Sequence, residues 1–274
     1  MGRSPERALT VAIAGLGAIG LPVARRLSAG ISGLALAAVT ARDRSAAEAK
    51  LKAAGIAAPV VGLGVLANRA DIIVECLPAS AFRLIAEPAI AAGRIFMPLS
   101  AGALLDHFDL VERAEACGAR IIVPTGALLG LDAVRAAAEG EIRSVRLVTR
   151  KPPRGLAGAP YLVERGIALD RLTAAERVFE GTAREGARGF PANVNVAAAL
   201  ALAGIGPDRT RLEIWADPSI ERNTHRIEVE ADSARFTLAI EGVPSAENPR
   251  TGRLTPLSVI ACLRRLVAPF SVGS

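Results

Sequence analysis

The chain contains two histidines, and one of them, His225, stands where it could move a proton. It lies in the segment DPSIERNTHRIEVE and begins an alternating apolar and polar stretch that predicts a strand. An ordinary imidazole titrates near neutral pH, so His225 could accept and donate a proton during a reaction. From the residue type alone, a hydrogen-bonded structural histidine is the simpler interpretation. His107 stands in a segment that predicts an amphipathic helix, and we interpret it as structural.

A glycine-rich segment near the N-terminus, GLGAIG, could bind a dinucleotide. Its first glycine allows a tight turn, its second lets the backbone approach a diphosphate, and its third lets a helix pack closely on a strand. The N-terminus of that helix would then face the diphosphate charge. An unrelated glycine-rich turn is the alternative, but a buried strand before the motif and a helix after it are the context that the fingerprint requires. The residues expected to contact the cofactor here are Gly15, Gly17, Ala18, Ile19 and Gly20.

The end of the second predicted strand bears on the choice between NAD and NADP. An acidic residue near this position usually binds the ribose hydroxyls of NAD. Here Thr40 stands where an acid is expected, while Arg42 and Arg44 could pair with the 2′-phosphate of NADP. Asp43 could still reach a ribose, and all of these charges could instead be solvated loop residues. The sequence therefore leaves both NAD and NADP open.

The ends of the later strands should line a nicotinamide crevice. Cys76-Leu77-Pro78-Ala79 and Ser100-Ala101-Gly102-Ala103 carry small residues where a flat ring must approach. We expect Cys76 and Leu77 to contact the cofactor. Because no histidine or basic partner is near Cys76 in the sequence, a buried inert thiol is a better interpretation than a nucleophile.

The elements that must position these residues alternate between strands and helices over the first half of the chain. Apolar runs predict strands at 10–15, 34–42, 70–78, 94–100 and 119–126, and helical spacing predicts helices at 17–30, 45–55, 82–93 and 104–118. Ser45 and Glu48 are expected to form a capping box. This order predicts an α/β domain, a doubly wound parallel sheet of the Rossmann type, over residues 1–125.

After residue 124 the pattern changes to that of a smaller α+β domain, over residues 126–246, with a mixed or antiparallel sheet. Strands are predicted at 144–153 and 211–217, and a hairpin at 224–232 and 234–242. An apolar helix is predicted at 194–205, with Asn193 as a candidate N-cap. Residues 247–274 form a loop and a final helix, for which Thr255 is the expected N-cap and Pro256 the first residue.

Composition excludes several classes of function. The chain has 274 residues and a net charge of +6, but its basic residues form no cluster with aromatic side chains, so we expect no nucleic-acid partner. Three well-separated cysteines without C-x-x-C spacing predict neither disulfides nor a metal site, and favour a reducing, cytoplasmic setting. No apolar run has membrane-spanning length. The apolar N-terminal stretch is better explained by the glycine motif than by a signal peptide.

Several segments together resemble the L-aspartate dehydrogenase family. They are GLGAIG, PTGALLGLDAVRAA (124–137), TRKPP (149–153), FPANVNVAAALALAGIG (190–206), DPSIERNTHRIEVE (217–230) and ENPRTGRLTPLSVIACLRRL (247–266). The resemblance implies a Rossmann domain joined to a smaller α+β domain, with the final helix returning to the Rossmann domain, and a homodimer through the exposed face of the second sheet. It also implies that His225 is catalytic and that Ala127 and Asn195 contact the nicotinamide cofactor.

The reaction implied by this resemblance is the NAD(P)-dependent oxidation of L-aspartate to iminoaspartate. The imine either hydrolyses to oxaloacetate and ammonia or is used in pyridine nucleotide biosynthesis. Cations must hold the two carboxylates, and the candidates are Lys151, Arg154, Arg222 and Arg250. Asn193 is a further candidate for binding the substrate. Lys151 could also assist proton transfer, or be a solvated loop lysine.

Two other functions stay open at this point. One is an NAD(P)-dependent oxidoreductase of the same architecture that acts on another amino or oxo acid. The other is an NAD(P)-binding sensor without catalysis, against which the intact Asn-Thr-His segment argues.

Overall fold

The computed structural model describes residues 7–248 and 251–273, and these form two compact units. The first unit combines the chain up to Ser100 with Asp106–Pro124 and Pro256–Ser271. The second combines Ala101–Leu105 with Thr125–Thr255 and the last residues from Val272. None of the helices in the described ranges has the length and apolarity that a membrane span requires.

A five-stranded parallel sheet with strand order β2-β1-β3-β4-β5 forms the centre of the first unit. Its strands are β1 (Leu9–Ala14), β2 (Leu34–Thr40), β3 (Ile72–Glu75), β4 (Ile95–Pro98) and β5 (Arg120–Ile121). They read as continuous apolar runs because helices bury both faces of a parallel sheet. The strand order reverses direction between β1 and β3, which is where ligands bind in folds of this type.

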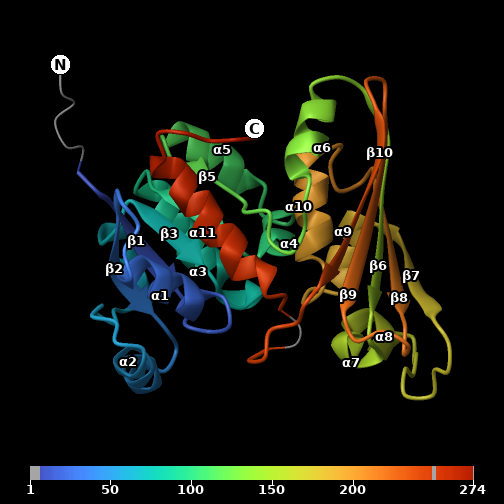
Figure 1. Ribbon diagram of the computed structural model, residues 1–274, viewed down its shortest axis with the longest axis horizontal. Helices are drawn as coiled ribbons and strands as arrows, with labels where there is room; N and C mark the ends of the chain where they lie inside the picture. The colour runs from blue at the N-terminus through green and yellow to red at the C-terminus, as the bar shows by residue number, and fades with distance from the viewer. Residues whose placement is uncertain (1–6, 249–250, 274) are drawn as a thin grey trace. The chain divides into compact units, whose positions relative to one another are not determined.

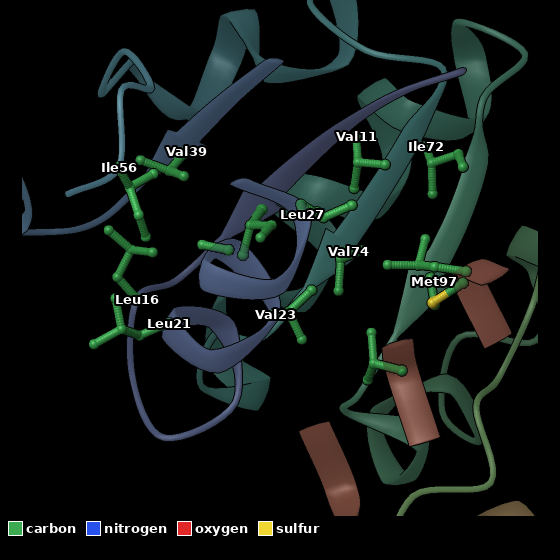
Figure 2. Packing of buried hydrophobic residues seen from close by; sticks show 14 of the residues in the cluster. Val11, Leu16, Leu21, Val23, Leu27, Val39, Ile56, Ile72, Val74 and Met97 are labelled. Atoms are coloured by element: carbon green, nitrogen blue, oxygen red, sulfur yellow. The ribbon is translucent and has the colours of Figure 1, made fainter. Parts of the chain in front are cut away.

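Helices of the first unit pack around this sheet (Figure 1). They are α1 (Gly20–Ser28), α2 (Arg44–Ala53), α3 (Phe82–Ala91), α5 (Asp109–Ala116) and α11 (Leu254–Val267), with short 3₁₀ segments η1 (Leu63–Asn68) and η2 (Ala79–Ala81). Figure 2 shows Val11, Val23 and Val74 packed together between β1, β3 and α1, with Met97 of β4 nearby. Val259 and Leu263 of α11 belong to the same buried cluster, so the last helix completes this core.

The second unit is built on a five-stranded mixed sheet with strand order β10-β9-β6-β8-β7. Its strands are β6 (Ile142–Lys151), β7 (Glu176–Thr182), β8 (Thr210–Ala216), β9 (Asn223–Ala231) and β10 (Arg235–Gly242). The β6–β8 pair is parallel, whereas β6–β9, β9–β10 and β7–β8 are antiparallel. The predicted fold class is therefore confirmed, although β7 was missed by the sequence analysis.

The mixed sheet has one face covered by helices and one open face. Figure 1 shows α6 (Leu131–Ala138), α9 (Ala183–Gly189) and α10 (Asn195–Ala203) along the covered face. Three shorter helices complete the unit, α4 (Ala101–Leu104), α7 (Pro153–Leu156) and α8 (Pro160–Glu164). Alternate residues of each strand point to opposite faces, so this division decides which side chains are buried.

Two predicted helix starts are wrong. The N-cap of α2 is Asp43, whose carboxylate accepts a hydrogen bond from the Ala46 N–H at 2.9 Å, whereas Ser45 is an exposed residue of the first turn. Thr255 lies inside α11, which already begins at Leu254. His107 is not helical either, because it lies between α4, which ends at Leu104, and α5, which begins at Asp109.

Two predictions in the second unit also need correction. Asn193 does not cap α10, whose N-cap is Val194, because the Asn193 side chain makes a long-range hydrogen bond instead. The β9 strand begins at Asn223, so His225 is its third residue and lies within a paired stretch.

Candidate functional site

The glycine turn of the first unit has the geometry that a diphosphate requires. Gly15 has a φ of +102°, and a Cβ there would lie 2.7 Å from the Cys76 carbonyl oxygen. A Cβ at Gly20 would overlap the Gly15 carbonyl, whereas one at Gly17 would meet no atom within 4 Å. The first and third glycines are thus required by packing, and the second leaves open space beside the backbone.

The N-terminus of α1 can receive negative charge. Its N-cap, Ile19, makes no side-chain capping hydrogen bond, and its first turn contains no acidic residue. Backbone N–H groups at a helix N-terminus together with the helix dipole favour an anion. The residues of the fingerprint therefore fit the diphosphate of a dinucleotide.

Cys76 and Leu77 follow β3 and lie beside the glycine turn. The Cys76 N–H donates to the Ala14 carbonyl at 2.8 Å, which joins the ends of β1 and β3 at the point where the strand order reverses. Burial, followed by the charge of Glu75, raises the pKa of the Cys76 thiol well above its ordinary value. A thiol with a raised pKa is a poor nucleophile, which agrees with an inert Cys76.

A buried carboxylate, Glu75, supports this edge of the sheet and was missed by the sequence analysis. Its side chain is 0% exposed and accepts hydrogen bonds from the Leu77 N–H at 2.7 Å, the Ser100 N–H at 3.0 Å and the Ser100 hydroxyl at 3.1 Å. Burial raises the pKa of Glu75, and these hydrogen bonds act in the opposite direction. Glu75 thus ties together the chain segments that follow β3 and β4. The sequence signal that could have found Glu75 is the acidic residue at the end of the apolar run IIVE.

The end of β2 carries positive charge beside the glycine turn. The Gly15 N–H donates to the Thr40 carbonyl at 2.8 Å, so the residues after Thr40 begin next to the turn. Arg42 is exposed there. Lys50 of α2, which the sequence analysis did not consider, donates from Nζ to the Leu16 carbonyl at 3.3 Å.

The acidic and remaining basic residues near β2 have other partners. The Asp43 carboxylate caps α2, and Arg44 forms an ion pair with Glu48 at 2.8 Å. Arg44 is therefore a weaker candidate than Arg42 for binding a phosphate.

In the second unit, His225 lies on the helix-covered face of the mixed sheet and is only 4% exposed. It pairs with Thr149 of β6 and Ile240 of β10, and its Nδ1 lies 3.0 Å from the Thr149 hydroxyl. Burial and then the charge of Lys151 lower the pKa of His225 to about 3. The expectation that His225 titrates near neutral pH is thus wrong for this structure. At neutral pH its ring is uncharged, and Thr149 holds it in a fixed orientation.

Lys151 is the last residue of β6 and is only 5% exposed, although lysine is rarely buried. Its Nζ donates to the Asn193 side-chain oxygen at 2.7 Å. Because Thr149 and Lys151 are two residues apart on one strand, both point to the face that carries His225. The structure therefore brings His225, Lys151 and Asn193 together, with Thr149 as a fourth member that sequence reasoning missed. An interpretation of Lys151 as a solvated loop residue is excluded.

The other predicted residues of the second unit are less central. The Asn195 side chain accepts a hydrogen bond from the Gly102 N–H at 3.1 Å, which fixes α4 against α10. Ala127 is half-buried and approaches Gly252. Arg154 and Arg222 are exposed, and Arg250 lies outside the described residues. Their roles toward a substrate or cofactor stay predictions.

The open face of the mixed sheet carries a hollow of about 550 Å³, and His225 is among the residues that line it. Most of its charged lining residues are paired: Arg146 contacts Glu213 and Glu228 at 2.6 and 2.9 Å. These ion pairs leave little net charge for binding an anionic substrate. The homodimer through this face stays a prediction. Within the described residues, no cluster of His, Cys, Asp and Glu has the makings of a metal site.

Comparisons with known proteins match both halves of the chain. Residues 132–266 match the family model "Aspartate dehydrogenase, C-terminal", and residues 15–124 match "Homoserine dehydrogenase, NAD binding domain". The chain is 56% identical to an L-aspartate dehydrogenase of Bradyrhizobium diazoefficiens over 97% of this chain and 94% of that protein. It is 51% identical to L-aspartate dehydrogenase 3 of Bordetella bronchiseptica over 99% and 100% of the two chains.

A solved structure shares the fold. The crystal structure of aspartate dehydrogenase from Thermotoga maritima matches with a TM-score of 0.74 at 23% sequence identity, covering 97% of this chain and 99% of that chain.

The environment of His225 gives a direct spectroscopic prediction. The chain has two histidines, so NMR of histidine-labelled protein should show two imidazole signals. The signal that disappears in a His107→Gln variant belongs to His107, which assigns the other to His225. We expect the His225 ring to stay neutral until the pH approaches about 3. Because the unfolded chain takes up this proton near its ordinary value of 6.5, the free energy of unfolding should fall as the pH is lowered between these two values. A His225 midpoint near 6.5 would contradict the described burial.

Proposed function

We propose a reaction from one premise: the chain belongs to the L-aspartate dehydrogenase family, as its sequence motifs indicated. It is an NAD(P)-dependent oxidoreductase that acts on an amino acid. The proposed reaction removes a hydride from Cα of L-aspartate, and the nicotinamide cofactor, when bound, accepts it. The α-ammonium group must lose one proton before the hydride leaves, and the product is iminoaspartate. Water then converts the imine to oxaloacetate and ammonia.

The neutral, buried imidazole of His225 is the observation that carries this proposal. An uncharged ring has a nitrogen lone pair that can accept the proton of the α-ammonium group. Contact between Nδ1 and Thr149 leaves Nε2 as the ring nitrogen for the substrate. Lys151 supplies a positive charge beside it, which suits a carboxylate of a dicarboxylic amino acid. Asn193 holds the Lys151 ammonium in place.

The charges near β2 support NADP as the preferred cofactor. Neither Thr40 nor Ala41 offers a carboxylate to the ribose hydroxyls, and Asp43 is engaged as the cap of α2. Arg42 and Lys50 place two cations near the glycine turn instead. A ribose with a 2′-phosphate gains from these cations, whereas a ribose with free hydroxyls finds no acidic acceptor there. We therefore propose Arg42 and Lys50 as its 2′-phosphate site.

Replacing His225 tests the proposed reaction. His225→Ala should lower kcat for the reduction of oxaloacetate with ammonia by about 10² to 10⁴, because it removes the proton-transfer group. The dissociation constant of the reduced cofactor, measured by fluorescence titration, should barely change. The control is His107→Ala, which removes the other imidazole from a different unit and should keep kcat. Loss of cofactor binding in His225→Ala would show that this role is wrong. In a panel of amino and oxo acids, failure of aspartate and response to another acid would support the alternative oxidoreductase.

The cofactor preference is tested by binding alone. Isothermal titration with 2′,5′-ADP and with 5′-ADP should show tighter binding of the ligand that carries the 2′-phosphate. Arg42→Ala should weaken 2′,5′-ADP binding about tenfold or more, the scale of one charged hydrogen bond, and leave 5′-ADP nearly unchanged. Arg44→Ala is the matched control, since it removes a nearby cation that is paired with Glu48. Equal affinity for the two ligands would overturn the NADP preference.

A further inference from the structure

A buried carboxylate at the carboxyl edge of the parallel sheet, Glu75, has no part in the proposed reaction. We propose that Glu75 is a positioning residue for the nicotinamide half of the cofactor, because its carboxylate holds the backbone that follows β3 and β4 beside the glycine turn. The inference rests on the proposed function only in taking a nicotinamide dinucleotide as the cofactor. It adds a division of the site, in which Arg42 and Lys50 serve one half of the cofactor and Glu75 serves the other.

The β3–β4 ladder ends where its two chains separate. Its last pair is Glu75 with Pro98, and proline has no N–H that could continue the ladder. One further backbone bond follows, from the Leu99 N–H to the Glu75 carbonyl at 3.0 Å. Beyond it, the N–H groups of Leu77 and Ser100 donate to the two carboxylate oxygens of Glu75, at 2.7 and 3.0 Å. The side chain thus bridges the two segments and sets the distance between them.

The Leu77 backbone is held at both its N–H and its carbonyl. The N–H donates to Glu75, and the carbonyl lies 3.2 Å from the Ser100 hydroxyl. That hydroxyl is also 3.1 Å from the Glu75 carboxylate, so it can donate to either acceptor. The carbonyl oxygen of the preceding residue, Cys76, would lie 2.7 Å from a Cβ at Gly15, so this segment packs directly against the glycine turn. Glu75 therefore fixes a wall of that turn.

Burial of Glu75 beneath a more accessible segment favours a role in binding a ligand. Glu75 is 0% exposed, whereas Cys76 and Leu77 are half-buried and Pro78 is exposed. A carboxylate is costly to bury unless hydrogen bonds compensate for the loss of water, and the three donors supply this compensation. The arrangement gives a fixed backbone that a ligand can still reach.

The order of the strands assigns this wall to one half of the cofactor. A dinucleotide lies across the crevice at the carboxyl ends of the strands, with its diphosphate at the first glycine turn and its adenosine ribose near the end of the second strand. In this sheet β2, which Arg42 follows, lies on one side of β1, and β3 and β4 lie on the other. The segments held by Glu75 are thus on the side where the nicotinamide half belongs.

Isothermal titration with a dinucleotide and its adenosine half tests this division. NADP⁺ is paired with 2′,5′-ADP and NAD⁺ with 5′-ADP, and the pair whose dinucleotide binds the unsubstituted protein more tightly is used. Glu75→Gln keeps the size of the side chain, but an amide offers one acceptor and one donor, so either the Leu77 or the Ser100 N–H loses its partner. We expect dinucleotide binding to weaken about tenfold or more, as for a lost hydrogen bond to a charged group, and the adenosine nucleotide to change less than about twofold.

Asp71→Asn is the matched control. Asp71 precedes β3 at the opposite edge of the sheet, where its carboxylate accepts hydrogen bonds from the Thr10 N–H at 2.8 Å and the Thr10 hydroxyl at 2.7 Å. The substitution removes a carboxylate that joins the same strands away from the crevice, so the ratio of the two affinities should not change. Ser100→Ala removes only the hydroxyl and should weaken dinucleotide binding less than Glu75→Gln does. It carries the test if Glu75→Gln does not fold.

Equal weakening of both ligands by Glu75→Gln, or no weakening of either, would overturn the inference, because a residue that only supports the fold does not separate them. The same two results with Ser100→Ala would overturn it as well. Separated affinities in a protein that does not oxidise aspartate would reject the proposed reaction and keep the role of Glu75. Aspartate oxidation together with equal weakening would reject the role of Glu75 alone.

Discussion

One electrostatic constraint underlies the site: a lysine ammonium and an imidazole buried side by side resist being charged at the same time. Removing a charge from water costs several kcal/mol unless partners compensate for it, as a general order of magnitude. Lys151 has the Asn193 oxygen at 2.7 Å, and His225 avoids the cost by staying neutral, with Thr149 at 3.0 Å. The cluster therefore places a neutral imidazole beside a buried lysine. A dicarboxylic amino acid complements both residues, because it offers a carboxylate to Lys151 and an ammonium proton to His225.

In the mixed sheet, alternate side chains of each strand point to opposite faces, and this alternation separates the buried cluster from the surface charges. On β6 the side chains of Thr149 and Lys151 are buried beneath helices, while Arg146 and Arg150 face the open side and pair with acidic residues. The same strand thus carries a buried cation on one face and exposed cations on the other. In the first unit, Glu75 performs a comparable function by joining the segments after β3 and β4, so that the loops near the glycine turn are held by a buried carboxylate.

The fold followed from the sequence because its signals are local. Apolar runs ending in glycine, such as β1 before Gly15, and the alternation of β9 and β10 are each set by neighbouring residues. The predictions that failed concern side chains whose partners lie far along the chain, or positions where a neighbouring side chain competes for the same role. Asn193 bonds to a lysine 42 positions away, and Asp43 displaced Ser45 as a cap because its carboxylate reaches the Ala46 N–H. The depressed basicity of His225 could not be read from its segment, since Lys151 approaches it only after β6 and β9 pair.

The measurement that tests the central claim most directly is a crystal structure of the chain with NADP⁺ and succinate bound together. We expect one succinate carboxylate within hydrogen-bond distance of Lys151 Nζ, about 3 Å, with His225 Nε2 directed at the ligand and the ring still in contact with Thr149. Succinate bound at the open face between Arg146 and Arg226, with Lys151 and His225 still enclosed by protein, would contradict the account.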